Sequence, residues 1–330
     1  MIFRILPRAM SDRSLRDASF FKKALAPACI GLALTLSACS GCTESSTEAT
    51  AGSTETAAAS YTVEHVMGTT VIDGPVERVV VIDSTHLDAL LALGITPVGA
   101  TESGAENGFP TYLADQLQNT ESVGSTSEPN LEKIASLDPD LIIGAKVRHE
   151  GNYEQLSAIA PTVMSEGSGT NWHEQAEITA AAVNRSAEMT DLINDLSTRA
   201  DEVGEEVGAE GQTVSMVRFR PDNFRLYGPE TFSGSILEEV DYDLGEKEWN
   251  EYSMMELSPE NFGQIDGDLI FYTIPGSPEA TTYPKISELW VDSPAVQQGK
   301  TYEFEDETWM VGIGVLGANE ILDDLEETLS

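Results

Sequence analysis

The chain has 330 residues and a formal net charge of −38, with 18 lysine and arginine residues against 56 aspartate and glutamate residues. So acidic a surface repels phosphate groups, which excludes nucleic acids and anionic lipid head groups as direct partners. The length is sufficient for a large core in one or two domains, and three cysteines are too few for a disulfide framework.

Residues 1–38 have the features of an export signal. Six basic residues precede a short apolar stretch from Ala24 to Leu36, which is too short for a membrane-spanning helix of ~20 apolar residues. The stretch ends in Leu-Ser-Ala-Cys at residues 36–39, which resembles the lipobox of bacterial lipoproteins. In those proteins the signal is cut before the cysteine, whose thiol then carries diacylglycerol. The resemblance predicts lipidation of Cys39; the alternative is an ordinary signal peptide with a chance cysteine.

The segment after the signal differs in composition from the rest of the chain. Residues 39–60 are rich in Thr, Ser, Glu and Ala, without apolar periodicity. Such a segment has too little apolar surface to offset the entropy of ordering, which predicts a flexible tether. Loss of the signal, with six basic and two acidic residues, takes the net charge from −38 to −42.

The folded part is expected to begin at Tyr61 with an N-terminal α/β lobe over residues 61–171. A buried strand is predicted over Arg78–Ile82, followed by a helix over Leu87–Leu93 that Gly94 closes. A second strand is predicted over Ile95–Gly99. Alternation of strands and helices indicates a mostly parallel sheet.

Two segments of the chain repeat each other. Residues 131–143 align without gaps on residues 259–271, with Glu132 matching Glu260. Each copy predicts a short helix, a turn set by Asp-Pro-Asp or Asp-Gly-Asp, and a buried parallel strand. A single repeat at this separation favours two similar lobes over a solenoid.

Between the copies, residues 172–206 are predicted to form bridging helices. Apolar residues recur at helical spacing, and Asn-Arg-Ser at 184–186 is expected to divide the segment into two helices. A C-terminal α/β lobe over residues 207–330 then begins with a strand over Val214–Phe219 and a helix over Ser233–Val240. The predicted fold is therefore two Rossmann-like α/β lobes with mostly parallel sheets, joined by one long interdomain helix.

Several motifs in this order are typical of one family. They are the lipobox and the segments Glu77–Val80, Asp88–Gly94, Pro129–Ile134, Pro139–Ile143, Leu257–Glu260 and Leu289–Trp290. With them the chain resembles the helical-backbone (class III) solute-binding proteins of ABC importers for ferric siderophores, haem and cobalamin. The resemblance implies a non-enzymatic monomer, lipid-anchored at the extracytoplasmic face of a bacterial membrane. It also implies ligand binding in a cleft between the lobes and delivery to an ABC permease dimer.

The ligand that we expect is a ferric siderophore, whose iron arrives already coordinated, so no cofactor and no direct metal ligand are predicted. Haem or cobalamin is the alternative within the family, and an axial haem ligand would be Tyr227 or His149. An exported α/β enzyme or a surface interaction protein on this scaffold is the alternative from another class. An enzyme would need an acid–base pair, which the sequence does not display, and fold alone cannot decide this.

The arginines are the first candidate ligand-binding residues, because only twelve cationic residues follow the signal. Arg218 and Arg220 fall on one face of a predicted strand, and Arg225 follows. The planar guanidinium suits an anionic chelate with oxygen acceptors. Arg148 lies just past a buried strand, at the end where open α/β sheets bind ligands. Pairing with local acids is the structural alternative.

Aromatic residues in predicted loops or strand ends of the second lobe are further candidates. Rings supply apolar area with a polar edge to a large chelate. The candidates are Tyr227, Trp249, Tyr252 and Tyr272. Core filling is the alternative, and it is the interpretation that we prefer for Trp290.

Glu132 and Glu260 match the glutamates that, in the resembling family, dock onto arginines of the permease. An acidic residue at a helix start also complements the helix dipole, and both roles are compatible.

Two other motifs are set aside. Gly312 to Gly317 matches GxGxxG but too little chain follows for a βαβ unit, and we expect it to open a C-terminal helix. The four histidines lack metal-ligand spacing.

Overall fold

The computed structural model describes residues 60–103 and 108–330. The predicted export signal, Cys39 and the tether up to Ala59 lie outside these residues. Within the described ranges, none of the helices combines the length and apolarity needed to cross a bilayer.

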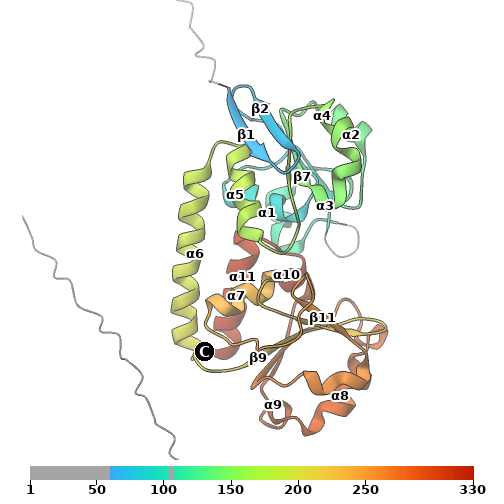
Figure 1. Ribbon diagram of the computed structural model, residues 1–330, viewed down its shortest axis with the longest axis vertical. Coiled ribbons are helices and arrows are strands. Elements are labelled where there is room, and N and C mark those ends of the chain that lie inside the picture. Colours follow the sequence, from blue (N-terminus) through green and yellow to red (C-terminus); the bar gives the residue numbers. More distant parts are fainter. Residues whose placement is uncertain (1–59, 104–107) are drawn as a thin grey trace, which may run out of the picture. The chain divides into compact units, whose positions relative to one another are not determined.

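The first lobe contains an antiparallel hairpin and a six-stranded sheet (Figure 1). The hairpin pairs β1 (Tyr61–His65) with β2 (Gly68–Ile72). The sheet has the order β6-β5-β4-β3-β7-β8, and all its pairs are parallel except β5 with β6. Its strands are β3 (Val79–Val81), β4 (Gly99–Glu102), β5 (Glu121–Ser125), β6 (Glu128–Pro129), β7 (Leu141–Ala145) and β8 (Thr162–Ser165). Its helices are α1 (Ser84–Ala92), η2 (Thr111–Leu117), α2 (Leu131–Ser136), α3 (Lys146–His149), η3 (Glu150–Asn152) and α4 (Tyr153–Ser157).

The second lobe is built on a five-stranded sheet with the order β11-β10-β9-β12-β13. β9, β12 and β13 are parallel, whereas β10 and β11 are antiparallel additions at one side, so this sheet is mixed. Its strands are β9 (Val214–Phe219), β10 (Phe224–Tyr227), β11 (Met254–Leu257), β12 (Leu269–Thr273) and β13 (Thr301–Phe304). Its helices are α7 (Phe232–Glu239), η4 (Pro259–Gln264), η5 (Pro278–Ala280), α8 (Tyr283–Leu289), η6 (Trp290–Asp292), α9 (Pro294–Gln297) and α10 (Asp306–Met310).

Three helices connect these two sheets. α5 (Trp172–Ala182) and α6 (Ser186–Val207) form the bridge, and α11 (Val315–Leu329) contacts both α6 and α1 (Figure 1). The break between α5 and α6 lies at Asn184, which has a left-handed φ of 57°, as the Asn-Arg-Ser signal predicts. α6 is about 33 Å long at 1.5 Å per residue, and Gly208 ends it in the left-handed conformation.

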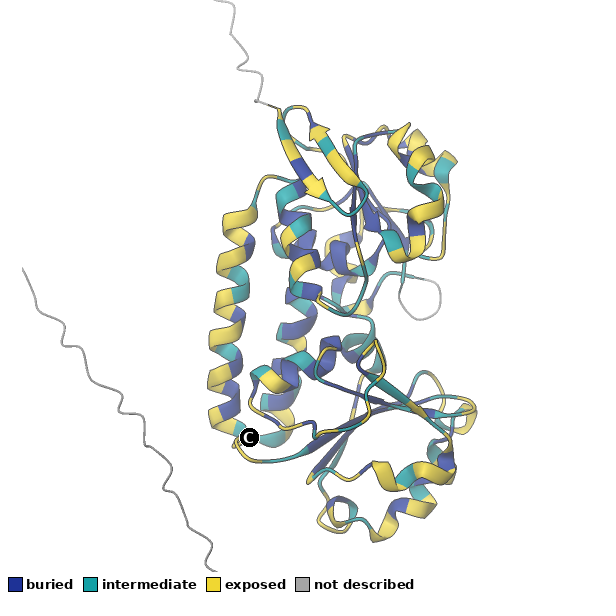
Figure 2. Ribbon diagram, viewed as in Figure 1, coloured by how far each residue is buried: buried dark blue, intermediate teal, exposed yellow. Residues whose placement is uncertain are grey.

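The largest hydrophobic cluster runs across the connection between the sheets. It joins residues of α1, α5, α6 and α11 with the inner face of the five-stranded sheet, including Leu93, Trp172, Leu196, Phe271 and Ile321. Figure 2 shows the buried residues in both sheets and on the inward faces of these helices, with the exposed residues of α6 on its outer side. α1 and α11 therefore hold the lobes together in addition to the chain crossing through α6.

Most predicted elements are present, and one is displaced. The two repeats form α2 with β7 and η4 with β12, as expected. The strand predicted over Ile95–Gly99 instead covers Gly99–Glu102. Residues 95–98 are needed to return the chain from the end of α1 to the sheet, and Pro97 has no N–H to donate to a ladder. Pairing to β3 accordingly begins at Gly99.

Candidate functional site

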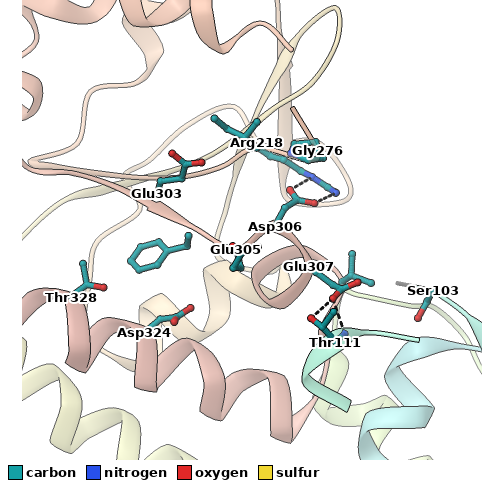
Figure 3. A pocket seen from close by; sticks show the side chains of 14 residues that line it. Ser103, Thr111, Arg218, Gly276, Glu303, Glu305, Asp306, Glu307, Asp324 and Thr328 are labelled. Atoms are coloured by element: carbon teal, nitrogen blue, oxygen red, sulfur yellow. Dashed lines mark hydrogen bonds and ion pairs between the residues drawn. The ribbon is translucent and has the colours of Figure 1, made fainter. Parts of the chain in front are cut away.

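Two cavities lie where the lobes face each other. Cavity I measures about 910 Å³ and is bounded by Ser103 and Thr111 of the first lobe and, in the second, by Arg218 and the residues that follow β12 and β13 (Figure 3). Cavity II measures about 150 Å³ and lies between the 168–170 loop and a wall that includes Tyr227, Phe232, Trp309 and Ile313. The parallel strands β9, β12 and β13 end at cavity I, which is where α/β sheets bind ligands.

Arg218 occupies a central place in cavity I because of its strand register. It lies on β9 beside Thr273 of β12 and Arg225 of β10. Its Nε and Nη2 donate to the two carboxylate oxygens of Asp306 at 2.8 and 2.6 Å (Figure 3). Thr273 Oγ1 donates to the same carboxylate at 2.8 Å. Burial alone would lower the pKa of Arg218, but Asp306 and Tyr227 raise it above its ordinary value. The guanidinium therefore stays charged and keeps its Nη1 for another acceptor.

Tyr227 joins the two cavities. Its phenol lies close enough to the guanidinium groups of Arg218 and Arg225 to raise the pKa of both. Arg225 in turn donates from Nε and Nη2 to Glu256 Oε2 at 3.0 and 2.8 Å. Because Arg218 lines cavity I and Tyr227 lines cavity II, these two residues form the border between the cavities. The arrangement presents two arginines and a phenol on one face of the sheet.

Arg148 lies on α3, directly after the carboxyl end of β7, as predicted. Its Nη1 donates to Asp83 Oδ2 at 2.6 Å; the Asp83 side chain is fully buried, whereas 42% of the Arg148 side chain is exposed. Asp83 also caps α1 through Thr85 N–H and accepts a hydrogen bond from Ser168 Oγ at 2.9 Å. Since Ser168 lines cavity II, Asp83 links Arg148 to the first-lobe wall of this cavity.

Comparison with known proteins identifies the family to which this chain belongs. The sequence profile of the periplasmic binding proteins matches residues 79–308 of the chain. The chain belongs to the periplasmic binding protein family. The probable siderophore-binding lipoprotein YfiY of Bacillus subtilis is 36% identical over 308 residues, which cover 89% of this chain and 93% of that protein. The Fe(3+)-citrate-binding protein YfmC of the same organism is 31% identical, over 82% of this chain and 86% of that protein.

Solved structures agree with this assignment. The crystal structure of Staphylococcus aureus SirA complexed with staphyloferrin B superposes with a TM-score of 0.71 and is 28% identical. The similarity covers 81% of this chain and 97% of that one. This periplasmic binding protein thus has the two-sheet architecture of its family. Cavities I and II lie between the two lobes of that fold.

Of two further predicted residues of this periplasmic binding protein, Tyr252 and Arg220, only the first lines one of the two cavities. Tyr252 lines cavity II and is 52% exposed. Arg220 follows the end of β9 in the turn to β10, where its N–H donates to the carbonyl of Asn223 at 2.9 Å. Within the ranges that the structure describes, Arg148, Arg218 and Arg225 each have a carboxylate partner, whereas the guanidinium of Arg220 has none.

The structure does not bring Trp249 and Tyr272 to these cavities. Tyr272 and Arg218 lie on opposite faces of the five-stranded sheet, and Tyr272 is 8% exposed. The ring of Tyr272 stacks on that of Tyr283, with the ring centroids 5.4 Å apart. Trp249 packs against the cluster on that same face and lines a separate surface hollow. For both residues, and for the buried Trp290, core packing accounts for the position.

Three of the four histidines, His65, His86 and His149, are engaged in local hydrogen bonds. Both ring nitrogens of His149 are used: Nδ1 accepts from Ala145 N–H at 3.3 Å, and Nε2 donates to the Thr126 carbonyl at 2.8 Å. This leaves no nitrogen of His149 for an axial haem bond. Among the described residues, no group of three His, Cys, Asp or Glu side chains has the geometry of a metal site.

Glu132 and Glu260 are both exposed in the first turn of their helices, as the repeat predicts. They differ in one respect. Lys285 Nζ lies 2.7 Å from Glu260 Oε1, and this hydrogen bond lowers the pKa of Glu260 to about 2. Glu260 is therefore ionised at any physiological pH.

The sequence patterns do not indicate the acidic partners of the arginines or the 168–170 loop that lines cavity II. Asp83 and Asp306 are 65 and 88 positions from Arg148 and Arg218. One signal was present for Asp83, which follows the predicted strand Arg78–Ile82, because the carboxyl ends of parallel strands meet at one edge of a sheet. Residues 168–170 carried no comparable signal.

Proposed function

We propose that this chain is the extracytoplasmic, lipid-anchored binding protein of an ABC importer and that it captures a ferric siderophore in cavities I and II. The siderophore would be anionic and rich in oxygen acceptors. The observation that carries the proposal is that Arg218, Arg225 and Tyr227 lie together on one face of the five-stranded sheet, in a chain with few cations. The names of YfiY, YfmC and SirA support the same ligand class.

The ligand-binding residues that we propose are Arg148, Arg218, Arg220, Arg225, Tyr227 and Tyr252. Arg218 and Arg148 would approach the chelate from opposite lobes with donors not used by Asp306 and Asp83. Guanidinium groups bind carboxylate oxygens by charge-assisted hydrogen bonds without transforming them. The protein would therefore bind and release its ligand unchanged, and it would need no cofactor.

The proposed organisation follows the importer cycle. Residues 1–38 would direct export, Cys39 would carry the lipid, and residues 39–60 would tether the protein to the membrane. Residues 61–171 and 207–330 would form the lobes, joined by the bridging helices 172–206. Glu132 and Glu260 would dock a monomer onto the permease, one glutamate per lobe.

Tryptophan fluorescence tests this function, because Trp309 lines cavity II. The protein is titrated with ferric citrate, ferric staphyloferrin B, haem and cobalamin. We expect saturable quenching by at least one of the two ferric complexes, and none by the same chelators without iron. Saturable quenching by haem or cobalamin alone would reject a ferric siderophore as the ligand.

A further inference from the structure

The first turn of α11 is capped by a residue from the other lobe. Gly314 precedes this helix and has no side chain with which to cap it. The N–H groups of Leu316 and Gly317 instead donate to the carboxylate of Asp88, each at 2.9 Å. Asp88 lies on α1 and is fully buried. Free N–H groups and the helix dipole make a helix N-terminus favourable for a carboxylate.

The GxGxxG motif provides the space for this contact. A Cβ atom on Gly314 would overlap the carboxylate of Asp88, and one on Gly317 would overlap the carbonyl of Gly312. A Cβ on Gly312 would meet the ring of Tyr112 at 3.0 Å. The three glycines therefore let α1, Tyr112 and the start of α11 approach one another closely. Close packing of the two helices therefore accounts for the three glycines of the motif.

A third donor comes from the segment next to cavity I. Tyr112 hydroxyl donates to Asp88 Oδ2 at 2.9 Å. The neighbouring Thr111 donates from its N–H to Glu307 Oε2 at 2.7 Å, and both residues line cavity I (Figure 3). The start of η2 is thus fixed to the second lobe by the carboxylate of Glu307 and to α1 by the carboxylate of Asp88.

α1 connects this contact with the proposed ligand-binding residues. Asp83 at its N-terminus holds Arg148 and Ser168, and Asp88 in its second turn holds α11. Ile313, two residues before the start of α11, lines cavity II opposite Ser168. A shift of α1 along α11 would consequently move the two walls of cavity II relative to each other.

We propose that Asp88 is a positioning residue of the binding site, which sets the separation of the two cavity walls by holding the N-terminus of α11 across the lobe boundary. The ligand part of this inference rests on the proposed function. The positional part does not, because the separation of the lobes exists without a ligand. Asp88 contacts no part of the cavity lining directly, so its effect on binding passes through α1 and α11.

The separation can be measured directly. The full chain with serine at Cys29, Cys39 and Cys42 receives two cysteines, Val71→Cys and Val291→Cys, at positions that are 57% and 51% exposed. Spin labels at these cysteines report the distance between the lobes by pulsed electron paramagnetic resonance. The background protein is compared with Asp88→Asn, whose amide places an N–H donor against backbone donors. Gly314→Ala should act like Asp88→Asn, and Gly263→Ala, where a Cβ meets nothing within 4 Å, is the matched control.

We expect Asp88→Asn and Gly314→Ala to broaden the distance distribution and to weaken ferric citrate binding roughly tenfold, whereas Gly263→Ala changes neither. An unchanged distribution in both variants would overturn the inference. If Asp88→Asn does not fold, Tyr112→Phe decides: it removes one donor and should broaden the distribution to a smaller degree, and no broadening counts against the proposal. Failure of the background protein to bind any ferric complex concerns the proposed function alone.

Discussion

Arg218 and Asp306 form a two-point ion pair at the border of the two cavities, with 18% and 14% of their side chains exposed. The acid occupies the Nε–Nη2 edge of the guanidinium and places a negative charge beside the donor that remains for an anionic chelate. It therefore competes with the ligand for the positive charge of Arg218, but it also orients the arginine. The balance between these effects decides whether a substitution of Asp306 strengthens or weakens ligand binding.

We expect Asp306→Asn to bind ferric citrate several-fold more tightly. Loss of one negative charge beside Arg218 makes the site more positive, and the amide keeps the shape of the side chain. The free energy of unfolding should fall by ~1–3 kcal/mol, because a largely buried charge loses its partner. Fluorescence titration and urea unfolding measure the two effects. Weaker binding would mean instead that orientation of Arg218 outweighs competition.

Arg218→Ala and Arg220→Ala should each weaken binding of ferric citrate by roughly 1–3 kcal/mol, the scale of a lost charge-assisted hydrogen bond. Arg185→Ala is the control, since Arg185 lies at the start of α6, outside the five-stranded sheet, and pairs there with Glu188. Isothermal titration calorimetry gives the affinities. Equal affinities for all three variants would exclude the arginines of β9 and its following turn from ligand binding.

The docking role of the two repeats is tested by Glu132→Ala combined with Glu260→Ala. Both residues are exposed and outside the cavities, so ligand affinity should not change, whereas uptake of radioactive iron by cells should be lost. Glu202→Ala combined with Glu206→Ala removes the same charge from the exposed face of α6 and should leave uptake normal. A loss of ligand affinity in the first pair would refute docking.

These residues also mark the limit of what the sequence predicts. The apolar period of α6, the break at Asn184 and the strands β7 and β12 depend on neighbours within a few positions, and sequence patterns predict them. The pairs Arg148–Asp83 and Arg218–Asp306 depend on which strands become neighbours in the sheets. The glycine motif before α11 illustrates the difference: its place at the start of a helix was predictable, but its partner Asp88 is 228 positions away.

Gly204 gives a prediction on packing. It lies inside α6, where alanine normally stabilises a helix by ~1 kcal/mol. A Cβ at this position would overlap the carbonyl of Val240 at the end of α7. Gly204→Ala should therefore lower the free energy of unfolding, by ~1–3 kcal/mol for an overpacked contact. Urea unfolding checks this against Gly263→Ala; stabilisation by Gly204→Ala would show that α7 moves away without cost.

The buried carboxyl of Asp88 predicts how stability depends on pH. Burial raises its pKa from 3.8 to about 6, although hydrogen bonds from Leu316, Gly317 and Tyr112 oppose the shift. Other ionisable groups around the contact are Tyr112 itself, with Glu307 and Glu320 near its hydroxyl. The folded state binds this proton more tightly than the unfolded chain does. The protonated carboxyl therefore stabilises the folded state at pH values below the pKa of Asp88 in the unfolded chain. This stabilisation is lost as the pH rises through the pKa of Asp88 in the folded state.

The wild-type protein should therefore lose about 3 kcal/mol of unfolding free energy relative to Asp88→Asn between about pH 4 and about pH 7, at 1.36 kcal/mol per pKa unit. The comparison with Asp88→Asn removes the contribution of the many other carboxylates, since these are common to both proteins. Urea unfolding at a series of pH values gives the difference. If the two proteins keep a constant difference over this range, Asp88 has an ordinary pKa, and its three hydrogen bonds fully offset its burial.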